Sequence, residues 1–365
     1  MLAKYVGVAA FVVGGSLLPA PLLVAQSGAR GSTHDATRGT SSIPHTLGPL
    51  HITSSIALPI TAGTVITFAE APDGAVFLAR QSTTTPKPSV VWVVDGTSAP
   101  SVAERLPRGA SALAADTKNL YVADYKRLTV FSRHTGDEVR AWALPNFSTA
   151  NTSDADLVSI SAYKGIALVM LPRGKFEAVY QVNGATPAAP KLVAQGSSMV
   201  FGPEGSLFIE RRDRRLVERT ARGSVIVGPK LRDAPTPLGG GVQFVDAVAA
   251  GLVWVSEPAG QGLDTSFAMY AESSLKLVGS SHQGLVNEQI VDSSSGALVL
   301  GFGDSPVKCP QTSSLSNVCV YRISSAAVLS DPTPVGSAFA LLGPQPAVIT
   351  TNGTSNQLDL ERLAS

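Results

Sequence analysis

Short alternating stretches of hydrophobic and polar residues recur along most of this chain, separated by residues typical of turns. One clear copy contains four such stretches, at Ser111–Ala115, Leu120–Asp124, Leu128–Ser132 and Glu138–Leu144. Alternation with a period of two is typical of β-strands. The four-strand unit returns roughly every 40 residues and about seven times, which is the spacing of the blades of a β-propeller. The pattern therefore predicts an all-β fold of four-stranded blades.

The turns between the first and second strands of these units repeat as well. Four units carry a glycine at the same phase, in Pro72-Asp73-Gly74, Tyr163-Lys164-Gly165, Pro203-Glu204-Gly205 and Ser294-Ser295-Gly296. Glycine supplies the positive φ angle that a tight hairpin requires. This agreement between distant segments favours a repeated structural unit.

The last unit predicts how the ring closes. It offers three strands, Ala338–Leu342, Ala347–Thr351 and Leu358–Leu363, whereas an unassigned strand, His51–Leu58, precedes the first complete blade. Pairing the N-terminal strand with the C-terminal blade would complete a seventh blade and remove the open sheet edges. We therefore expect residues 49–365 to form one seven-bladed β-propeller domain.

The second unit resembles a known class of repeat. Leu120-Tyr121-Val122-Ala123-Asp124, then Leu128-Thr129-Val130-Phe131, then Thr135-Gly136-Asp137-Glu138-Val139 is similar to the repeat of the YVTN and NHL families of β-propellers. The other units share its phase and turns but not this signature. The resemblance implies a toroidal propeller used mostly for binding. Some related propellers are lactonases, lyases or quinoproteins, so the resemblance also leaves enzymatic functions open.

The N-terminus has the organisation of a secretory signal. Residues 1–25 contain a charged start at Lys4 and an apolar run from Tyr5 to Ala25 that is interrupted by two glycines and two prolines. This arrangement favours a signal peptide cleaved after Ala25 or Ala29. The alternative is an uncleaved membrane anchor, because the run is nearly long enough to span a bilayer. Residues 26–48 are mostly polar and predict a flexible lead-in.

Cysteine use agrees with export. The two cysteines, Cys309 and Cys319, flank a loop rich in serine and threonine. An even number of cysteines in an exported chain favours a disulfide, whereas a redox or metal pair is usually more closely spaced. The prediction is a structural disulfide in a secreted, periplasmic or cell-surface protein.

Composition and charge narrow the range of partners. The chain is 44% hydrophobic and 15% charged, with 34 glycines and 25 prolines, which fits many short strands. Its formal net charge is +1, and loss of the leader would leave equal numbers of basic and acidic residues. This neutrality argues against a dedicated nucleic-acid binder. Arginine outnumbers lysine, and alanine and glycine are abundant, which suggests a GC-rich bacterial source.

Candidate binding residues lie in the loops that a propeller places on one face. These loops join the second strand to the third, or the fourth strand to the next blade. In blades two to four they contain eight basic residues: Lys126, Arg127, Arg173, Lys175, Arg211, Arg212, Arg214 and Arg215. Together these would form a positive sector that holds carboxylates or phosphates. The alternative is a solvated rim of local ion pairs.

Candidate catalytic groups are sparse. A lactonase-like metal site could draw on carboxylates and an amide near the inner strands, which are Glu70, Asp246, Asn287, Glu288 and Asp292. They match no spacing rule. Thr135-Gly136 with Trp142 fits a quinoprotein docking motif poorly, a hydrolytic triad would depend on His282, and no G-x-S-x-G sequence occurs. The sequence therefore identifies no catalytic residue, metal ligand or cofactor.

These patterns together predict an exported binding or scaffolding module. Its partner would be a protein or an anionic cell-surface polymer at the loop face, with contact to a membrane only if the leader is retained. The alternative is a metal-dependent hydrolase or lyase of the lactonase-like propeller type.

Overall fold

The computed structural model describes most of the domain that the sequence predicts. The described residues are 49–81, 87–124, 126–145, 158–173, 176–231, 244–258, 265–282, 286–293, 295–302, 309, 318–323, 329–343, 345–352 and 355–364. The predicted leader (residues 1–25) and the predicted lead-in (residues 26–48) lie outside them, as does most of the loop between the two cysteines.

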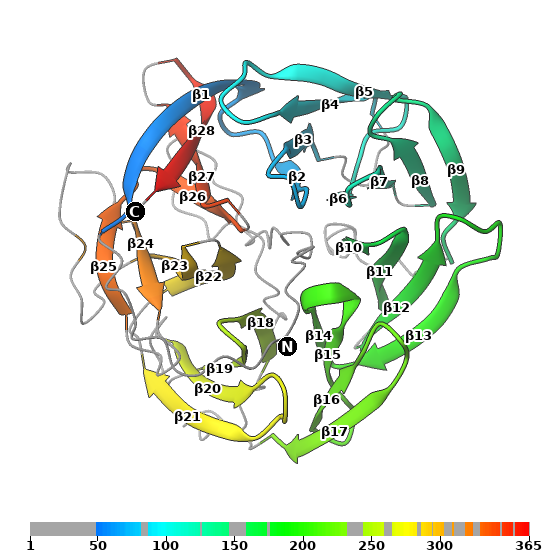
Figure 1. Ribbon diagram of the computed structural model, residues 1–365, viewed down its shortest axis with the longest axis vertical. Coiled ribbons are helices and arrows are strands. Elements are labelled where there is room, and N and C mark those ends of the chain that lie inside the picture. Colours follow the sequence, from blue (N-terminus) through cyan, green and yellow to red (C-terminus); the bar gives the residue numbers. More distant parts are fainter. Residues whose placement is uncertain are drawn as a thin grey trace, which may run out of the picture.

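Seven four-stranded antiparallel sheets form a ring around a central axis, within the residues that the structure describes (Figure 1). In each of the first six blades the strands follow one another from the axis to the rim. This arrangement confirms the all-β, seven-bladed propeller predicted from the repeat.

The first three blades contain twelve of the strands. Blade 1 consists of β2 (Ile66–Glu70), β3 (Val76–Arg80), β4 (Ser89–Val94) and β5 (Ser101–Leu106). Blade 2 consists of β6 (Ala112–Ala115), β7 (Asn119–Ala123), β8 (Arg127–Ser132) and β9 (Glu138–Ala143). Blade 3 consists of β10 (Ser159–Tyr163), β11 (Ile166–Arg173), β12 (Phe176–Asn183) and β13 (Lys191–Gly196).

The next three blades repeat this order. Blade 4 consists of β14 (Ser198–Phe201), β15 (Leu207–Glu210), β16 (Arg215–Arg219) and β17 (Val225–Lys230), with a 3-10 turn at Pro203–Gly205. Blade 5 consists of β18 (Phe244–Ala249), β19 (Leu252–Pro258), β20 (Thr265–Ala271) and β21 (Leu277–His282). Blade 6 consists of β22 (Val286–Ser293), β23 (Gly296–Phe302), β24 (Val318–Ile323) and β25 (Leu329–Pro334).

The seventh blade closes the ring as the sequence predicts. It contains β26 (Ala338–Leu342), β27 (Ala347–Asn352), β28 (Gln357–Ala364) and, outermost, β1 (His51–Thr61) from the N-terminus. The antiparallel register of β1 and β28 runs from His51 opposite Ala364 to Thr61 opposite Gln357. Strand β1 extends past the predicted end at Leu58, since Pro59 is tolerated on an edge strand.

Hydrophobic packing between neighbouring blades forms the core. One buried cluster joins residues of β6 to β9 to residues of β10 to β12, and another joins blade 7 to blade 1. The innermost strand of blade 2, β6, is the sequence Ala-Leu-Ala-Ala and is buried at every position. Small side chains suit this position because the innermost strands crowd around the axis.

The glycine turns adopt the predicted conformation. Gly74, Gly165, Gly205 and Gly296 all have positive φ, between 76° and 93°. Blade 5 has an equivalent turn at Ala250 and Gly251, with φ values of 56° and 71°, which the sequence pattern did not reveal.

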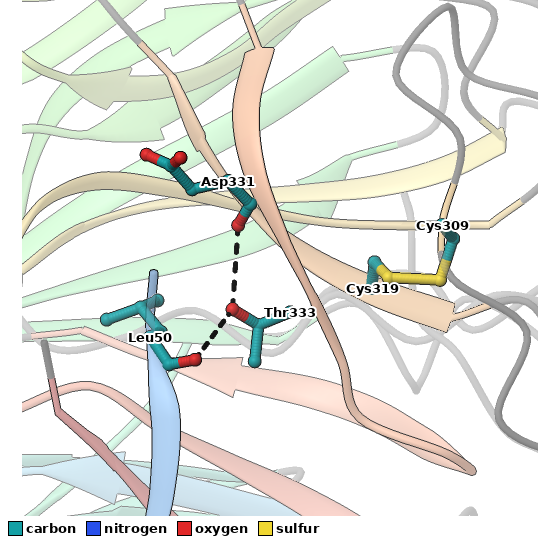
Figure 2. Close-up of a disulfide and its surroundings, with 5 residues drawn as sticks. All are labelled: Leu50, Cys309, Cys319, Asp331 and Thr333. Atoms are coloured by element: carbon teal, nitrogen blue, oxygen red, sulfur yellow. Dashed lines mark hydrogen bonds between the residues drawn. A yellow bond between two sulfur atoms is a disulfide. The ribbon is translucent and has the colours of Figure 1, made fainter. Parts of the chain in front are cut away.

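A disulfide joins Cys309 to Cys319 across a Cα–Cα distance of 5.8 Å, as predicted (Figure 2). Cys319 belongs to β24, and both cysteines pack in the hydrophobic cluster shared by blades 5 and 6. Figure 2 also shows Thr333 of β25, whose hydroxyl donates a hydrogen bond of 3.1 Å to the carbonyl oxygen of Leu50. The N-terminal segment therefore contacts blade 6 as well as blade 7.

Within the described part of the chain, no helix has the length and apolar character needed to cross a bilayer.

Candidate functional site

The loops of the ring fall on two faces because each blade has four strands. An even number of strands returns the chain to the face where the blade began, so the first strands of all blades run in one direction. We call the loop face the one that carries the connections from second to third strands and from each blade to the next. We call the turn face the one that carries the connections from first to second and from third to fourth strands.

A carboxylate organises the loop between β7 and β8 of blade 2. Asp124 accepts hydrogen bonds from the backbone N–H groups of Lys126 and Arg127 through Oδ1, at 2.7 and 2.8 Å. Its other oxygen lies 3.1 Å from Nε of Arg108, which comes from the connection between blades 1 and 2. Arg127 Nη2 also lies 2.5 Å from Oε1 of Glu138. Lys126 is exposed on the loop face.

A buried carboxylate has a similar role between β15 and β16 of blade 4. Glu210 is fully buried, and its Oε1 lies 3.0 Å from Nη1 of Arg214. Its other oxygen accepts a hydrogen bond from the Ser198 hydroxyl, whose oxygen accepts one from the backbone N–H of Val245 in blade 5. Arg214 therefore neutralises a charge inside the blade. The hairpin of β15 and β16 brings the two residues together.

The structure places most of the eight predicted basic residues on the loop face. Lys126, Arg211, Arg212 and Arg215 are exposed, whereas Arg127 and Arg214 are half-buried. Arg211 lies 3.5 Å from Asp213, which leaves both side chains in solvent. Arg173 ends β11 on the same face, but its side chain lies outside the described residues, and so does Lys175.

The contacts of these residues differ from one residue to the next. Arg127 forms an exposed ion pair with Glu138, as expected for a solvated rim, and pairs of this kind contribute about 0–1 kcal/mol. The pair between Arg214 and Glu210 is different, because its carboxylate is fully buried. The exposed residues of blades 2 and 4 flank blade 3 on a single face, as a binding sector would require. We therefore treat the exposed residues Lys126, Arg211, Arg212 and Arg215 as the candidate site, and the half-buried Arg127 and Arg214 as its support.

Further cations that we did not single out in the sequence lie on the same face. Arg80 ends the second strand of blade 1, Lys87 lies in the following loop, and Arg108 precedes blade 2. Lys230 ends β17 beside Arg215, its register partner on β16. All four are exposed. These residues occupy the same kinds of connection as the predicted ones, either between the second and third strands or between blades. Their position in the repeat could therefore have identified them from the sequence.

Two of the proposed metal-binding carboxylates join neighbouring blades. Glu70 at the end of β2 is fully buried, and its Oε1 accepts a hydrogen bond of 2.8 Å from the backbone N–H of Gln345 in blade 7. Asp292 in β22 accepts one of 2.9 Å from the backbone N–H of Ala250 in blade 5. These contacts give both side chains a structural role on the turn face.

Asp246 is the most perturbed carboxyl near the axis. It occupies a bulge in β18, between the paired residues Val245 and Ala247, and bulges can redirect a side chain. Asp246 is exposed at the surface, although neighbouring protein atoms displace part of the hydration of its carboxyl group. This desolvation raises the pKa of Asp246 to about 7, against hydrogen bonds with Ser256 that lower it.

The other catalytic candidates gain no common site. The side chains of Asn287, Glu288 and His282 lie outside the described residues. Trp142 is buried between blades 2 and 3, and the 133–135 turn after β8 contains His134. Among the described residues, no three histidine, cysteine, aspartate or glutamate side chains gather in a way that could hold a metal ion.

These features define a seven-bladed β-propeller with several exposed cations on its loop face. Comparisons with known proteins do not assign it to a family. No protein-family model matches the chain, and no curated protein matches it.

Several solved structures have a similar fold. The WD40 domain of Toxoplasma gondii coronin is 10% identical, with 87% of each chain covered and a TM-score of 0.49. The Dos1 propeller is 12% identical, with 84% of this chain and 82% of that chain covered and a TM-score of 0.48. BBS1N in complex with ARL6DN is 12% identical, with coverage of 87% and 98% and a TM-score of 0.46. Likeness at this level carries no argument about function, and the fold is established by the strand pairing itself.

Proposed function

We propose that the protein is an exported binding or scaffolding module that recognises a protein or an anionic cell-surface polymer through its loop face. The observation that carries the proposal is the set of exposed cations on that face, which are Lys126 of blade 2 and Arg211, Arg212 and Arg215 of blade 4. Arginine binds carboxylates and phosphates through two parallel hydrogen bonds, which makes it effective for this purpose.

The scaffold suits such a role because the cations are mounted on a rigid ring. The loop of blade 2 is fixed by Asp124, and that of blade 4 by the Arg214–Glu210 ion pair. Residues held in this way lose little conformational entropy when a ligand binds. The Cys309–Cys319 disulfide supports an oxidising, extracellular location, as the leader sequence does.

The test is a reversal of charge in blade 4. The triple variant Arg211→Glu, Arg212→Glu and Arg215→Glu should bind immobilised poly-glutamate and polyphosphate at least about tenfold more weakly than the wild type, as measured by surface plasmon resonance. Arg214 is left intact because it neutralises buried Glu210. Binding by the wild type should also weaken as salt is added, since exposed charges are screened.

The matched control reverses three exposed lysines on the turn face, in the variant Lys118→Glu, Lys164→Glu and Lys276→Glu. It changes the net charge equally and should retain near-normal binding. Equal loss in the two variants would mean that only net charge matters, and unchanged binding by the arginine variant would contradict the proposal.

A further inference from the structure

Strand β17 presents an unusual edge at the rim of the ring. It is the outermost strand of blade 4, and of the described strands only β16 pairs with it. Its first three residues, Val225, Ile226 and Val227, are 59%, 39% and 52% exposed. An edge strand presents a row of backbone N–H and carbonyl groups that are available to another strand.

The outer strands of blades 1 and 2 carry charges where β17 is aliphatic. Strand β5 has Glu104 and Arg105 in its centre, and Glu138 and Arg140 lie on both sides of Val139 in β9. Charged residues on an edge normally discourage pairing with other chains. Strand β17 lacks this protection until Pro229 and Lys230, so the pairing edge extends from Ser224 to Gly228.

Exposed aliphatic residues also lie on the outer strand of the neighbouring blade. Gly228 of β17 packs so closely on Leu275 of blade 5 that an added Cβ would lie 2.7 Å from the Leu275 Cβ. Two residues further along the chain, β21 begins with Leu277 and Val278, which are 50% and 54% exposed. Figure 1 shows β17 and β21 following each other along the rim.

Positive charge lies at both ends of this edge. Arg222 is exposed in the turn before β17, and Lys230 and Arg215 are exposed at its other end. If a second copy paired antiparallel about Ile226, Arg222 of each chain would face Lys230 of the other, and like charges directly opposite are destabilising. An aliphatic strand flanked by acidic residues would instead be complementary in either direction.

We propose that β17 is a docking site for an extended segment of a partner protein, which adds a fifth strand to blade 4. Backbone hydrogen bonds to the edge give the affinity, and the aliphatic side chains of the segment cover Val225 and Val227. Acidic residues at its ends contact Arg222 on one side and Arg215 and Lys230 on the other. The inference rests on the proposed function and deepens it, because it defines the partner as an acidic, aliphatic polypeptide in β-conformation.

The probe is a fluorescein-labelled peptide of nine residues in which valine and threonine alternate between two acidic residues at each end. Its binding is followed by fluorescence anisotropy. A peptide with lysines in place of the acidic residues should bind at least tenfold more weakly. Two further peptides are methylated on every second backbone nitrogen, one in each register. One of the two should fail to bind, because methylation removes the donors that face β17.

Protein variants separate the edge from the charges around it. Val225→Thr with Val227→Thr keeps residues that favour strands but removes apolar contact, and it should weaken binding about tenfold. Arg222→Gln with Lys230→Gln should weaken it to a similar degree. The matched control, Val102→Thr with Val139→Thr, changes exposed valines on the outer strands of blades 1 and 2 and should leave binding unchanged.

Each alternative result overturns the inference. Equal binding of both methylated peptides would exclude strand addition, as would full binding by the β17 threonine variant or no binding by the wild type. A dimer seen by sedimentation and lost in that variant would assign the edge to a second copy of the chain. The proposed function fails separately: its charge reversal is repeated with Arg211→Glu and Arg212→Glu alone, which leaves Arg215 beside β17 intact, and unchanged binding of poly-glutamate by that variant would contradict it.

Discussion

Buried acidic residues in this propeller connect neighbouring blades. Asp116, which follows β6 and is only 3% exposed, accepts hydrogen bonds of 2.8 Å from the backbone N–H groups of Lys118, Asn119 and Gly165, and one of 3.0 Å from the Tyr121 hydroxyl. Gly165 belongs to the turn of blade 3, so a single carboxylate links two blades. A carboxylate suits this position because it can accept several hydrogen bonds at once.

Replacing this carboxylate should therefore destabilise the ring. Asp116→Ala removes the acceptor for three backbone donors and for Tyr121, and we expect a loss of about 3–5 kcal/mol in the free energy of unfolding. The smaller change Tyr121→Phe should cost about 1 kcal/mol. Urea denaturation followed by circular dichroism measures both.

A second consequence of the same change concerns the titration of Tyr121. Burial and the nearby charge of Asp116 raise the pKa of the Tyr121 phenol. In Asp116→Ala the tyrosine should ionise at lower pH than in the wild type, as seen in ultraviolet absorbance. Equal stability of the alanine variant and the wild type would show that solvent satisfies the donors and that the link between blades is weak.

Packing between blades limits which residues fit in the outer strands. Two glycines in equivalent strands, Gly228 and Gly279, differ in the space available for a larger side chain. Gly228 of β17 and Gly279 of β21 follow similar aliphatic residues at similar positions in blades 4 and 5. A Cβ on Gly228 would lie 2.7 Å from the Leu275 Cβ and 3.0 Å from the Leu216 carbonyl oxygen, whereas one on Gly279 would meet only the end of Met269 at 3.5 Å.

We expect Gly228→Ala to destabilise the protein by about 1–3 kcal/mol, because neither neighbour lies at the flexible end of a side chain. Gly279→Ala is the matched control and should be neutral or stabilising by up to about 1 kcal/mol, since it restricts the unfolded chain. Thermal unfolding of the two variants under the same conditions decides the point. A similar loss of stability in both variants would mean that the contact between Gly228 and Leu275 is not the reason for glycine at position 228.

The fold of the whole molecule is more predictable from the sequence than its candidate site. Alternation and turn glycines define most strands. The incomplete last unit predicts the pairing of β1 with β28, because this pairing completes a four-stranded blade and joins the two ends of the ring. The Arg214–Glu210 ion pair was not predictable, since both residues read as loop charges until packing buries one of them. Nor does the sequence reveal the exposed edge of β17, because Val-Ile-Val is equally typical of a buried strand.

Ring closure makes a prediction about cooperativity. Leu58 and Ile60 of β1 are each only 1% exposed, and they pack in the cluster shared by blades 7 and 1. Leu58→Ala with Ile60→Ala should cost at least about 4 kcal/mol, whereas Ile52→Ala in the same strand should cost little because Ile52 is 44% exposed. Loss of these two side chains would weaken the pairing of β1 in blade 7 and the packing of blade 7 on blade 1.

Repeat proteins are stabilised mainly by contacts between adjacent units, and a closed ring gives every blade two neighbours. Loss of one junction should therefore lower the stability of blades that do not contact β1. Trp254 of blade 5, which is fully buried against Phe267, reports on a distant part of the ring. For this measurement, Trp92 and Trp142 are replaced by phenylalanine in every protein compared. In the variant with Leu58→Ala and Ile60→Ala, the unfolding midpoint in urea should fall to the same value by Trp254 fluorescence and by circular dichroism. A fluorescence midpoint that stays at the wild-type value while circular dichroism shifts would show that blade 7 opens alone and that closure stabilises only its own neighbours.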